Sequence, residues 1–445
     1  MLKDRYGNQA STTSQAAMER YNEALDLTRL YRGDPIAALD AALAEDPDFG
    51  GAWAMRAGLL VQTTDKAYAE ETAKSLRAGA AANLNDREQQ HLQAAQDWAE
   101  GRYHDGTARL ARVAQEHPRD VLAVQLAHTG CFFLGLQHEL RDWPLQALRA
   151  FRSGDDGYSY IKGMAAFGFE ECGDYARADL YGREAVEADP RDGWAVHAVA
   201  HVNEMRGDLE AGIPWLAGNA QHWAPESGFA YHNWWHLALL YMDRGDNAKA
   251  LALYDEKVRP DPSSQIVLEW VDASALLWRL HLEGVDTGDR FDKLAACWQR
   301  AGEDAIYAFN DLHAVMAFLG AGRATDAERT LRAMRGAIAR GGDNGYMTRK
   351  AGLPLAEAFV AFEAGRYVEC VEKIAATRGL AQRFGGSHAQ RDILTLTAVH
   401  AALRGGLAGV AEAFTAERLA HKPQSPWAGR LARQARELSD KAHAA

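Results

Sequence analysis

A two-residue signal, a glycine followed by a charged residue, recurs along this chain at the ends of apolar helical stretches. A small side chain stands five residues after each of these glycines. The glycines are Gly33, Gly101, Gly173, Gly207, Gly245, Gly322 and Gly365, and the small residues are Ala38, Gly106, Ala178, Gly212, Ala250, Ala327 and Cys370. A glycine ends a helix by adopting the left-handed conformation, and a small residue lets a second, antiparallel helix approach closely. The sequence therefore predicts a helical hairpin that is repeated many times.

The spacing of these hairpins resembles that of the tetratricopeptide repeat, whose period is about 34 residues. The step from Gly173 to Gly207 is 34 residues, and the best single copy covers residues 231–262. Prolines that stop the second helix stand at Pro118, Pro190 and Pro262. Residues 118–155 and 264–301 match the repeat poorly. We expect an all-α fold, a tetratricopeptide-repeat α-solenoid in which the hairpins form a right-handed superhelix.

One continuous array is favoured over several separate domains. The 445 residues include only 12 prolines, no long Gly/Ser-rich linker interrupts them, and apolar residues recur at helical spacing almost throughout. We expect an N-terminal segment over residues 1–16, a single superhelical domain over 17–437 and a C-terminal tail over 438–445.

The net charge of −12 disfavours nucleic acid as a partner, because it repels a phosphate backbone. The first residues, MLKDRYGNQASTTSQ, are charged and lack the apolar core of a secretory signal, and no apolar run approaches the roughly 18 residues of a membrane span. We expect a cytoplasmic protein with no membrane partner. The oligomeric state is left open.

Common catalytic and metal-binding motifs are absent. The four cysteines lie far apart and form no CxxC pair, which argues against a disulfide framework or a zinc knuckle. No Walker A loop, dinucleotide-binding glycine motif, HExxH or GxSxG occurs. Nucleotide hydrolysis, dinucleotide chemistry and the common hydrolase mechanisms are therefore disfavoured, and no organic cofactor is expected.

In tetratricopeptide repeats the first helix of each hairpin lines the concave groove, and this resemblance selects positions 13, 10, 6, 3 and 2 residues before the turn glycine. The side chains selected in this way are Tyr160, Phe167, Glu170, Glu171, Trp194, His197, His201, Glu204, Met205, His232, Trp235 and Asp243. The groove is thus expected to collect histidine, tryptophan and acidic residues.

The histidines of two neighbouring hairpins are expected to converge. His197, His201 and Glu204 stand at i, i+4 and i+7 and share one helix face, while His232 and His236 are one turn apart on the next hairpin. Packed helices lie about 8 to 10 Å apart, a distance that two inward imidazoles can bridge. The alternative is that each histidine is an ordinary hydrogen-bonded core or surface residue and that the tryptophans pack the repeats.

The whole chain also resembles a specific family, that of tetratricopeptide repeat protein 38 and its bacterial relatives. The matching stretches are STTS at 11–14, REQ at 87–89, YIKG at 160–163, WAVHAVAHVNEM at 194–205, HNWWHLAL at 232–239, VDASALLWRLHLEGV at 271–285, FNDLHAVMA at 309–317, GLPL at 352–355, GGSHAQRD at 385–392 and KPQSP at 422–426. The resemblance implies the fold and a set of signature residues, without implying a reaction. Those residues are His197, His201, Glu204, His232, His236, Asp272, Arg279, Asn310, Asp311, His313, Arg391 and Asp392.

This set is mostly histidine and acid, which suits proton transfer or metal ligation better than the clamping of a peptide. His236 and His313 occupy equivalent hairpin positions, and Asp311 or Asp272 is expected to orient one of them. Two alternatives are structural salt bridges, one between Asp272 and Arg279 and one between neighbours 391 and 392.

Two functions follow as hypotheses. The first is an enzyme that hydrolyses, eliminates or isomerises a small polar molecule in the groove. Its catalytic candidates are His197, His201, Glu204, His236, His313 and Asp311; its substrate-binding candidates are Tyr160, Trp194, His232, Trp235, Asp272, Arg279, Asn310, Arg391 and Asp392. The second is a non-catalytic scaffold that binds a peptide or protein partner.

A divalent metal ion is an open alternative for the enzyme. HxxxHxxE and HxxxH would supply His197, His201, Glu204, His232 and His236 as ligands, and zinc, iron and manganese all accept such donors.

Overall fold

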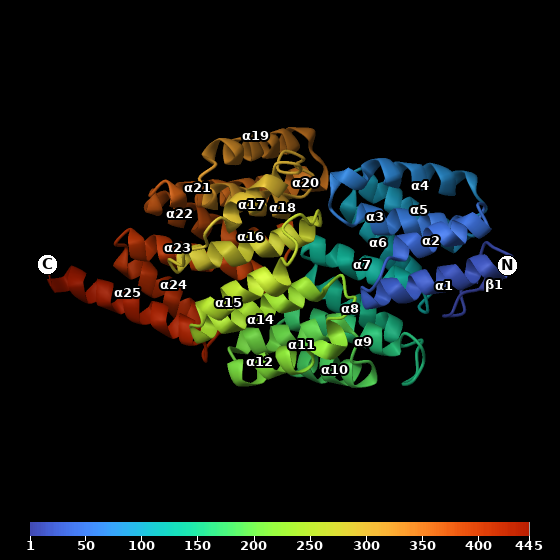
Figure 1. Cartoon of the computed structure of the whole chain (residues 1–445), viewed down its shortest axis with the longest axis horizontal. Helices are drawn as coiled ribbons and strands as arrows, with labels where there is room; N and C mark the ends of the chain where they lie inside the picture. Colours follow the sequence, from blue (N-terminus) through green and yellow to red (C-terminus); the bar gives the residue numbers. More distant parts are fainter. Residues whose placement is uncertain (445) are drawn as a thin grey trace. The chain divides into compact units, whose positions relative to one another are not determined.

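A computed structural model describes residues 1–444 of the chain, and these residues form an almost wholly helical protein (Figure 1). Its only strands in the described part are β1 (Leu2–Lys3) and β2 (Gln9–Ala10), which pair antiparallel in register Leu2 with Ala10. Successive helices form antiparallel hairpins, which confirms the all-α, tetratricopeptide-type α-solenoid. None of the described helices combines the length and the apolar character needed to cross a bilayer.

The helices group into two compact units, here called unit 1 (1–199 and 219–230) and unit 2 (200–218 and from 231 onward). Unit 1 contains α1 (Gln15–Leu30), α2 (Pro35–Glu45), α3 (Gly50–Val61), α4 (Ala69–Ala81), α5 (Asp86–Ala99), α6 (Tyr103–Glu116), α7 (Val121–Leu134), α8 (Gln137–Leu148), α9 (Tyr158–Glu171), α10 (Tyr175–Ala188) and α13 (Ala220–Trp223). The long helix α11 (Gly193–Arg206) contributes residues to both units. The expectation of one domain over 17–437 stays a prediction.

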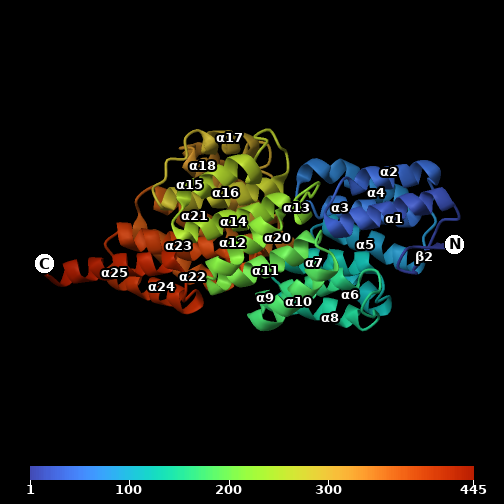
Figure 2. The ribbon, with the colours of Figure 1, turned by 60° about the horizontal axis from the view of Figure 1, so that its bottom comes forward.

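Unit 2 continues the pattern of packed helices, and α24 lies against α25 at its C-terminal end (Figure 2). Its helices are α12 (Leu209–Gly218), α14 (Ala230–Arg244), α15 (Asn247–Leu253), α16 (Val267–Leu282), α17 (Arg290–Trp298), α18 (Ala308–Gly320), α19 (Ala324–Arg340), α20 (Gly342–Met347), α21 (Leu353–Glu363), α22 (Tyr367–Thr377), α23 (His388–Arg404), α24 (Ala408–His421) and α25 (Pro426–Ala444). Residues 438–444, expected as a tail, continue α25.

The recurring Gly-Asp signal both ends one helix and starts the next. All seven turn glycines have a positive φ between 56° and 91°, as the left-handed conformation requires. In four copies an aspartate follows and caps the second helix, and Asp34, Asp174 and Asp246 each accept a hydrogen bond from a backbone N–H three residues later. In the other three copies an arginine follows, and its side chain forms no cap. One dipeptide therefore sets the hairpin turn.

The small residues five positions later allow the close packing that the sequence predicts. A Cβ atom added to Gly106 would lie 2.4 Å from Cδ1 of Trp98, and one added to Gly212 would lie 2.9 Å from Cδ1 of Leu240. The two segments that match the repeat poorly are helical hairpins as well. Their turns use Gly135 and Gly284, both with positive φ, but an apolar residue follows each glycine, so no aspartate cap is present.

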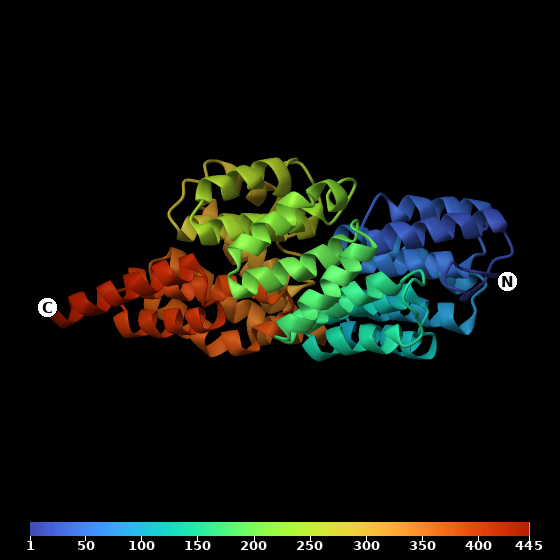
Figure 3. The ribbon, with the colours of Figure 1, turned by 90° about the horizontal axis from the view of Figure 1, so that it is seen from below.

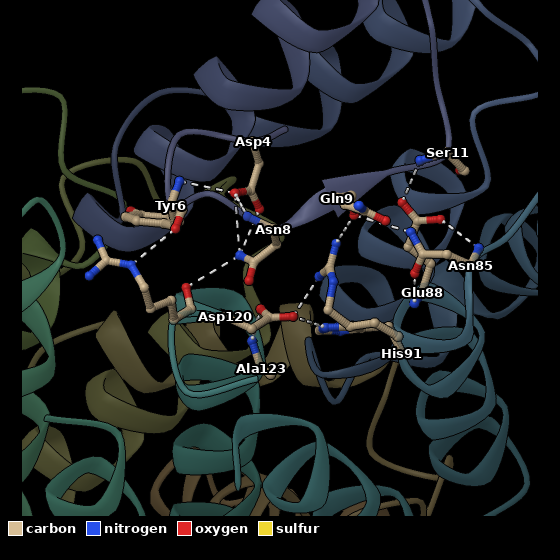
Figure 4. Close-up of polar contacts among 12 residues, drawn as sticks. Asp4, Tyr6, Asn8, Gln9, Ser11, Asn85, Glu88, His91, Asp120 and Ala123 are labelled. Atoms are coloured by element: carbon tan, nitrogen blue, oxygen red, sulfur yellow. Dashed lines mark hydrogen bonds and ion pairs between the residues drawn. The ribbon is translucent and has the colours of Figure 1, made fainter. Parts of the chain in front are cut away.

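In unit 1 the N-terminal ribbon is fastened to α5 by a buried polar network (Figure 4). Arg87 donates to the carbonyl of Gln9 at 2.9 Å and to Asp120 Oδ2 at 2.5 Å, and Glu88 accepts from the backbone N–H of Ser11 at 3.0 Å. These contacts join the STTS and REQ stretches, which lie 73 residues apart from the end of one to the start of the other (14 to 87). Residues 2–11 are therefore built into this unit.

Candidate functional site

The histidines of α11 and α14 that belong to unit 2 are buried together. His201 and His236 have no exposed surface, and His232 is 7% exposed. His232 and His236 stand one turn apart on α14, so helical geometry places them on one face. The ring centroids of His201 and His236 are 4.4 Å apart. The predicted convergence of these three imidazoles is present in the structure.

Two carboxylates and two imidazoles form one continuous line of contacts. Oε2 of Glu204 lies 2.8 Å from Nδ1 of His236, and Oδ2 of Asp272 lies 2.6 Å from Nδ1 of His232. The two Nε2 atoms face each other at 3.2 Å. Because an ionised carboxylate only accepts hydrogen bonds, each Nδ1 carries a hydrogen and donates it outward. The two Nε2 atoms then face each other, and a cation shared between them, either a proton or a metal ion, makes this contact attractive.

The outer oxygens of both carboxylates are held in turn by residues from the C-terminal third. Nζ of Lys422 lies 3.3 Å from Oε1 of Glu204, and Nε2 of Gln390 donates to Oδ1 of Asp272 at 3.4 Å. Lys422 also lies 3.7 Å from Oδ2 of Asp392, whose other oxygen pairs with Arg418. Although burial opposes it, these two cations hold the pKa of Asp392 below its usual range.

The loop from Lys422 to Trp427 is itself fixed onto unit 2. Oγ of Ser425 donates to Oδ1 of Asp243 at 2.5 Å, and the backbone N–H of Trp427 donates to the same oxygen at 3.0 Å. This loop therefore delivers Lys422 in a defined position.

Arg279 and Trp235 lie beside the histidines. The Arg279 guanidinium is 1% exposed, sits 5.3 Å from the Trp235 ring centroid and donates to the backbone carbonyls of Ala275 and Ala389. Trp235 stacks on His232 with an interplanar angle of 12°. Burial lowers the pKa of Arg279 to about 10. The guanidinium is bound by carbonyls rather than by a carboxylate, so the alternative of a salt bridge between Arg279 and Asp272 is not formed.

Burial also governs the ionisation of His236. Together with the positive charge of neighbouring side chains, burial lowers the pKa of His236 well below its usual value, which favours the neutral ring. A neutral imidazole is the form that accepts a proton or ligates a metal ion.

Three predicted residues lie in unit 1. His197 is buried among the rings of Phe167, Trp194 and Phe229, with centroid distances of 5.0, 5.0 and 5.3 Å. The Tyr160 hydroxyl donates to Oδ2 of Asp189 at 2.6 Å. Trp194, His197 and Tyr160 are thus packed in unit 1, and their assignment to a site stays a prediction.

The predicted residues of α18 are buried, but His313 and Asp311 do not form the expected hydrogen bond. Nδ1 of His313 donates to the carbonyl of Phe309 at 2.7 Å, and no hydrogen bond in the described chain joins His313 to Asp311. Asn310 is buried on the same helix. Burial raises the pKa of Asp311 well above its usual value, which favours the protonated acid. Asp272 contacts His232, which is neither of the two histidines that it was expected to orient, and the carboxylate beside His236 is that of Glu204.

Arg391 and Asp392 of α23 do not pair with each other. Asp392 pairs with Arg418 and Lys422, so its alternative salt bridge with residue 391 is not formed. Arg391 donates to the carbonyl of Gly386.

Sequence reasoning missed Lys422, Arg418 and Gln390 as partners of the cluster. Two of them stand in quoted stretches, Gln390 in GGSHAQRD and Lys422 in KPQSP. That was the available signal, but spacing along the chain gave no reason to join residue 422 to residue 204.

No family model matches this chain. Among solved structures, it is similar to the APC/C hetero-tetramer Cut9–Hcn1, with 12% identity, a TM-score of 0.44 and coverage of 94% of this chain and 76% of that chain. It is also similar to a monomeric mutant of IFIT1 with Gppp-AAAA, with 14% identity, a TM-score of 0.36 and coverage of 94% of both chains. A third is the P58(IPK) TPR domain, with 12% identity, a TM-score of 0.20 and coverage of 96% of this chain and 99% of that chain. The resemblance to the family of tetratricopeptide repeat protein 38 stays a prediction.

Proposed function

We propose that the protein is an enzyme that acts on a small polar molecule bearing an anionic group, with His201, His232 and His236 at its catalytic centre. The observation that carries this proposal is the pair of buried imidazoles whose outer nitrogens are held by carboxylates and whose Nε2 atoms meet at 3.2 Å. Such an arrangement fixes the tautomer and the direction of each ring, which catalysis requires.

Stability alone gives a weak reason for this cluster. Buried ion pairs are often no more stabilising than apolar side chains of the same volume, because desolvation of the charges offsets their attraction. Glu204, Asp272 and Lys422 are each at most 5% exposed. A set of charges buried this deeply is better explained by chemistry than by packing.

Arg279 supports an anionic group on the substrate. Its guanidinium is buried beside Trp235, and its hydrogen bonds go to backbone carbonyls. A carboxylate or phosphate oxygen is the strongest acceptor for such a group. The centre would then act on a bond close to this anion, by hydrolysis, elimination or isomerisation.

The test is a turnover screen with phosphate monoesters, carboxylate esters and 2-hydroxy acids as probes. We expect His236→Asn to lower kcat/KM by at least about 100-fold for any substrate that is turned over. The matched control is His281→Asn, because His281 also pairs with a carboxylate, Glu363, but lies at a half-exposed site. Equal activity of the His236→Asn variant and the wild type would contradict the proposal.

A binding scaffold is the second candidate, and the repeat fold supports it more directly than it supports catalysis. Arrays of helical hairpins present extended surfaces that bind peptides or other proteins. A pull-down with wild type and Trp235→Ala separates the two functions. A stoichiometric partner that is lost in the variant favours the scaffold, whereas a small molecule retained by the wild type in native mass spectrometry favours the enzyme.

A further inference from the structure

We propose that His201, His232 and His236 bind one divalent transition-metal ion, with zinc as the best match. The proposal deepens the proposed function, since it concerns the same cluster and names the cation that would act there.

The distance between ring nitrogens matches that of ligands on one ion. Zinc–nitrogen bonds are about 2.0 to 2.1 Å, so two nitrogens at tetrahedral angles lie about 3.3 to 3.4 Å apart. The Nε2 atoms of His232 and His236 are 3.2 Å apart. One ring nitrogen of His201 lies within 4.8 Å of a ring nitrogen of each of the other two.

The outer contacts are those of metal-binding histidines. A ligating imidazole commonly donates its other N–H to a carboxylate, which fixes the ring and raises its basicity. Glu204 does this for His236 and Asp272 does it for His232. Lys422 and Gln390 hold the remaining oxygens of these carboxylates. The two carboxylates also offset the charge of a divalent cation.

Two other buried histidines of this chain are held at Nδ1 by a backbone carbonyl, and a third, His91, lies 2.8 Å from Oδ2 of Asp120. His313 donates Nδ1 to the carbonyl of Phe309 at 2.7 Å, and His128 donates Nδ1 to that of Leu140 at 3.2 Å. Neither has a carboxylate partner at that nitrogen. His232 and His236 differ from them, because each has a carboxylate on one side and faces the other ring on the other side.

Within unit 2, three histidines are available as ligands, which leaves the fourth position of a tetrahedral ion for another donor. Structural zinc sites use four protein ligands, frequently cysteines, whereas catalytic sites use three and leave a position for water or substrate. The four cysteines of this chain are at positions 131, 172, 297 and 370 and take no part in the cluster. An ion held in this way would polarise a bound oxygen of the substrate.

The experiment uses the full chain, stripped with EDTA and then titrated with Co²⁺ and with Zn²⁺. We expect one equivalent to bind and the Co²⁺ form to show the visible bands of a tetrahedral site. His232→Asn or His236→Asn is expected to abolish those bands. Glu204→Gln is expected to weaken binding by about 10- to 100-fold, because it removes an outer partner without removing a ligand. His281→Asn is the control and should bind as the wild type does.

Far-UV circular dichroism checks that each variant folds. If the histidine variants do not fold, metal binding by Glu204→Gln, which keeps the shape of the side chain, tests the proposal. Binding of less than about 0.1 equivalent by the wild type, or undiminished binding by Glu204→Gln and the histidine variants, would overturn the proposal. Turnover that persists in EDTA would refute the metal site and leave the proposed enzyme standing. One bound equivalent without any turnover would support the metal site and count against the enzyme.

Discussion

Asp192 illustrates how burial sets the ionisation of a single side chain. Its Oδ1 accepts hydrogen bonds from the backbone N–H groups of Trp194 and Ala195 at 3.1 and 3.0 Å, at the start of α11. Burial raises the pKa of Asp192 to about 7, the negative charge of Asp189 adds to this increase, and Arg29 opposes it. The native state thus keeps a proton that the unfolded chain releases near pH 4.

The sign of the pH dependence follows. Between about pH 4 and pH 7 the native state binds more protons than the unfolded state, so the free energy of unfolding falls as the pH rises, by up to about 1 kcal/mol per pH unit. We predict that Asp192→Asn removes this contribution. Urea unfolding of wild type and variant at pH 5, 6 and 7 measures it, and a constant difference between the two proteins across these values would refute the prediction.

A second prediction for unit 1 concerns the ion pair between Arg87 and Asp120 and its contribution to the free energy of unfolding (Figure 4). Both side chains are buried, and Asp120 also lies 2.8 Å from Nε2 of His91. Removal of one partner leaves the other charged and buried, which costs about 3 to 5 kcal/mol. We therefore expect Arg87→Met to lower the free energy of unfolding by this amount. Arg20→Met, which breaks an exposed pair with Glu23, is the control and should change it little.

For single residues, the sequence predicts which side chains lie together when helical spacing places them on one face of a helix. His232 and His236 on α14, and His201 with Glu204 on α11, were found in this way. Lys422 and Gln390 were not, because their contacts with Glu204 and Asp272 span 218 and 118 residues. Contacts at such separations depend on how hairpins stack, and periodicity within one helix holds no information about that.

At the scale of the helices, α8 and α9 pack closely because Gly168 of α9 has no side chain. A Cβ atom added to Gly168 of α9 would lie 2.3 Å from Cα of Arg141 and 2.6 Å from the carbonyl oxygen of Leu140, both in α8. These are backbone atoms, so the two helices would have to separate. We predict that Gly168→Ala lowers the free energy of unfolding by about 1 to 3 kcal/mol.

Gly409 of α24 provides the matched control, since a Cβ atom there meets nothing within 4 Å. Gly409→Ala should leave the free energy of unfolding unchanged or raise it by up to about 1 kcal/mol, because alanine favours a helix. Chemical unfolding of the two variants tests the pair. A loss of stability in Gly409→Ala equal to that in Gly168→Ala would show that packing is not the cause.

The helices themselves were largely predictable from the turn glycines. The Gly-Asp dipeptide carries both a helix end and a helix start, so each copy marks a hairpin with little ambiguity. The α7–α8 and α16–α17 hairpins were harder to predict, because Gly135 and Gly284 are followed by Leu136 and Val285. Without a charged residue after it, the signal is only a glycine, which also occurs inside helices, as at Gly168.

For the molecule as a whole, the repeated pattern of packed helices is visible from a third direction in Figure 3. The sequence predicts this architecture because every hairpin obeys the same local rule. It does not predict the division into two compact units, since no change of composition marks residue 199 or residue 219.

The C-terminal helix and the loop before it are predicted to stabilise unit 2. A chain that ends at His421 lacks Lys422, Ser425 and Trp427. Glu204 then keeps His236 but loses Lys422, and Asp243 loses its contacts with Ser425 and Trp427. We expect a lower urea midpoint and faster hydrogen exchange in residues 200–206 and 231–244. A chain that ends at Glu437 removes only the last turns of α25 and serves as the control. Identical exchange in the two shortened chains would contradict this role.

The salt bridge between Lys422 and Glu204 joins two residues that are synthesised at different times. A nascent chain carries His201, His232 and both carboxylates long before Gln390 and Lys422 leave the ribosome. Until then, those carboxylates lack the groups that neutralise and orient them in the finished protein. The cluster of His201, His232, His236, Glu204 and Asp272 therefore gains its complete set of contacts only after residue 422 has been synthesised.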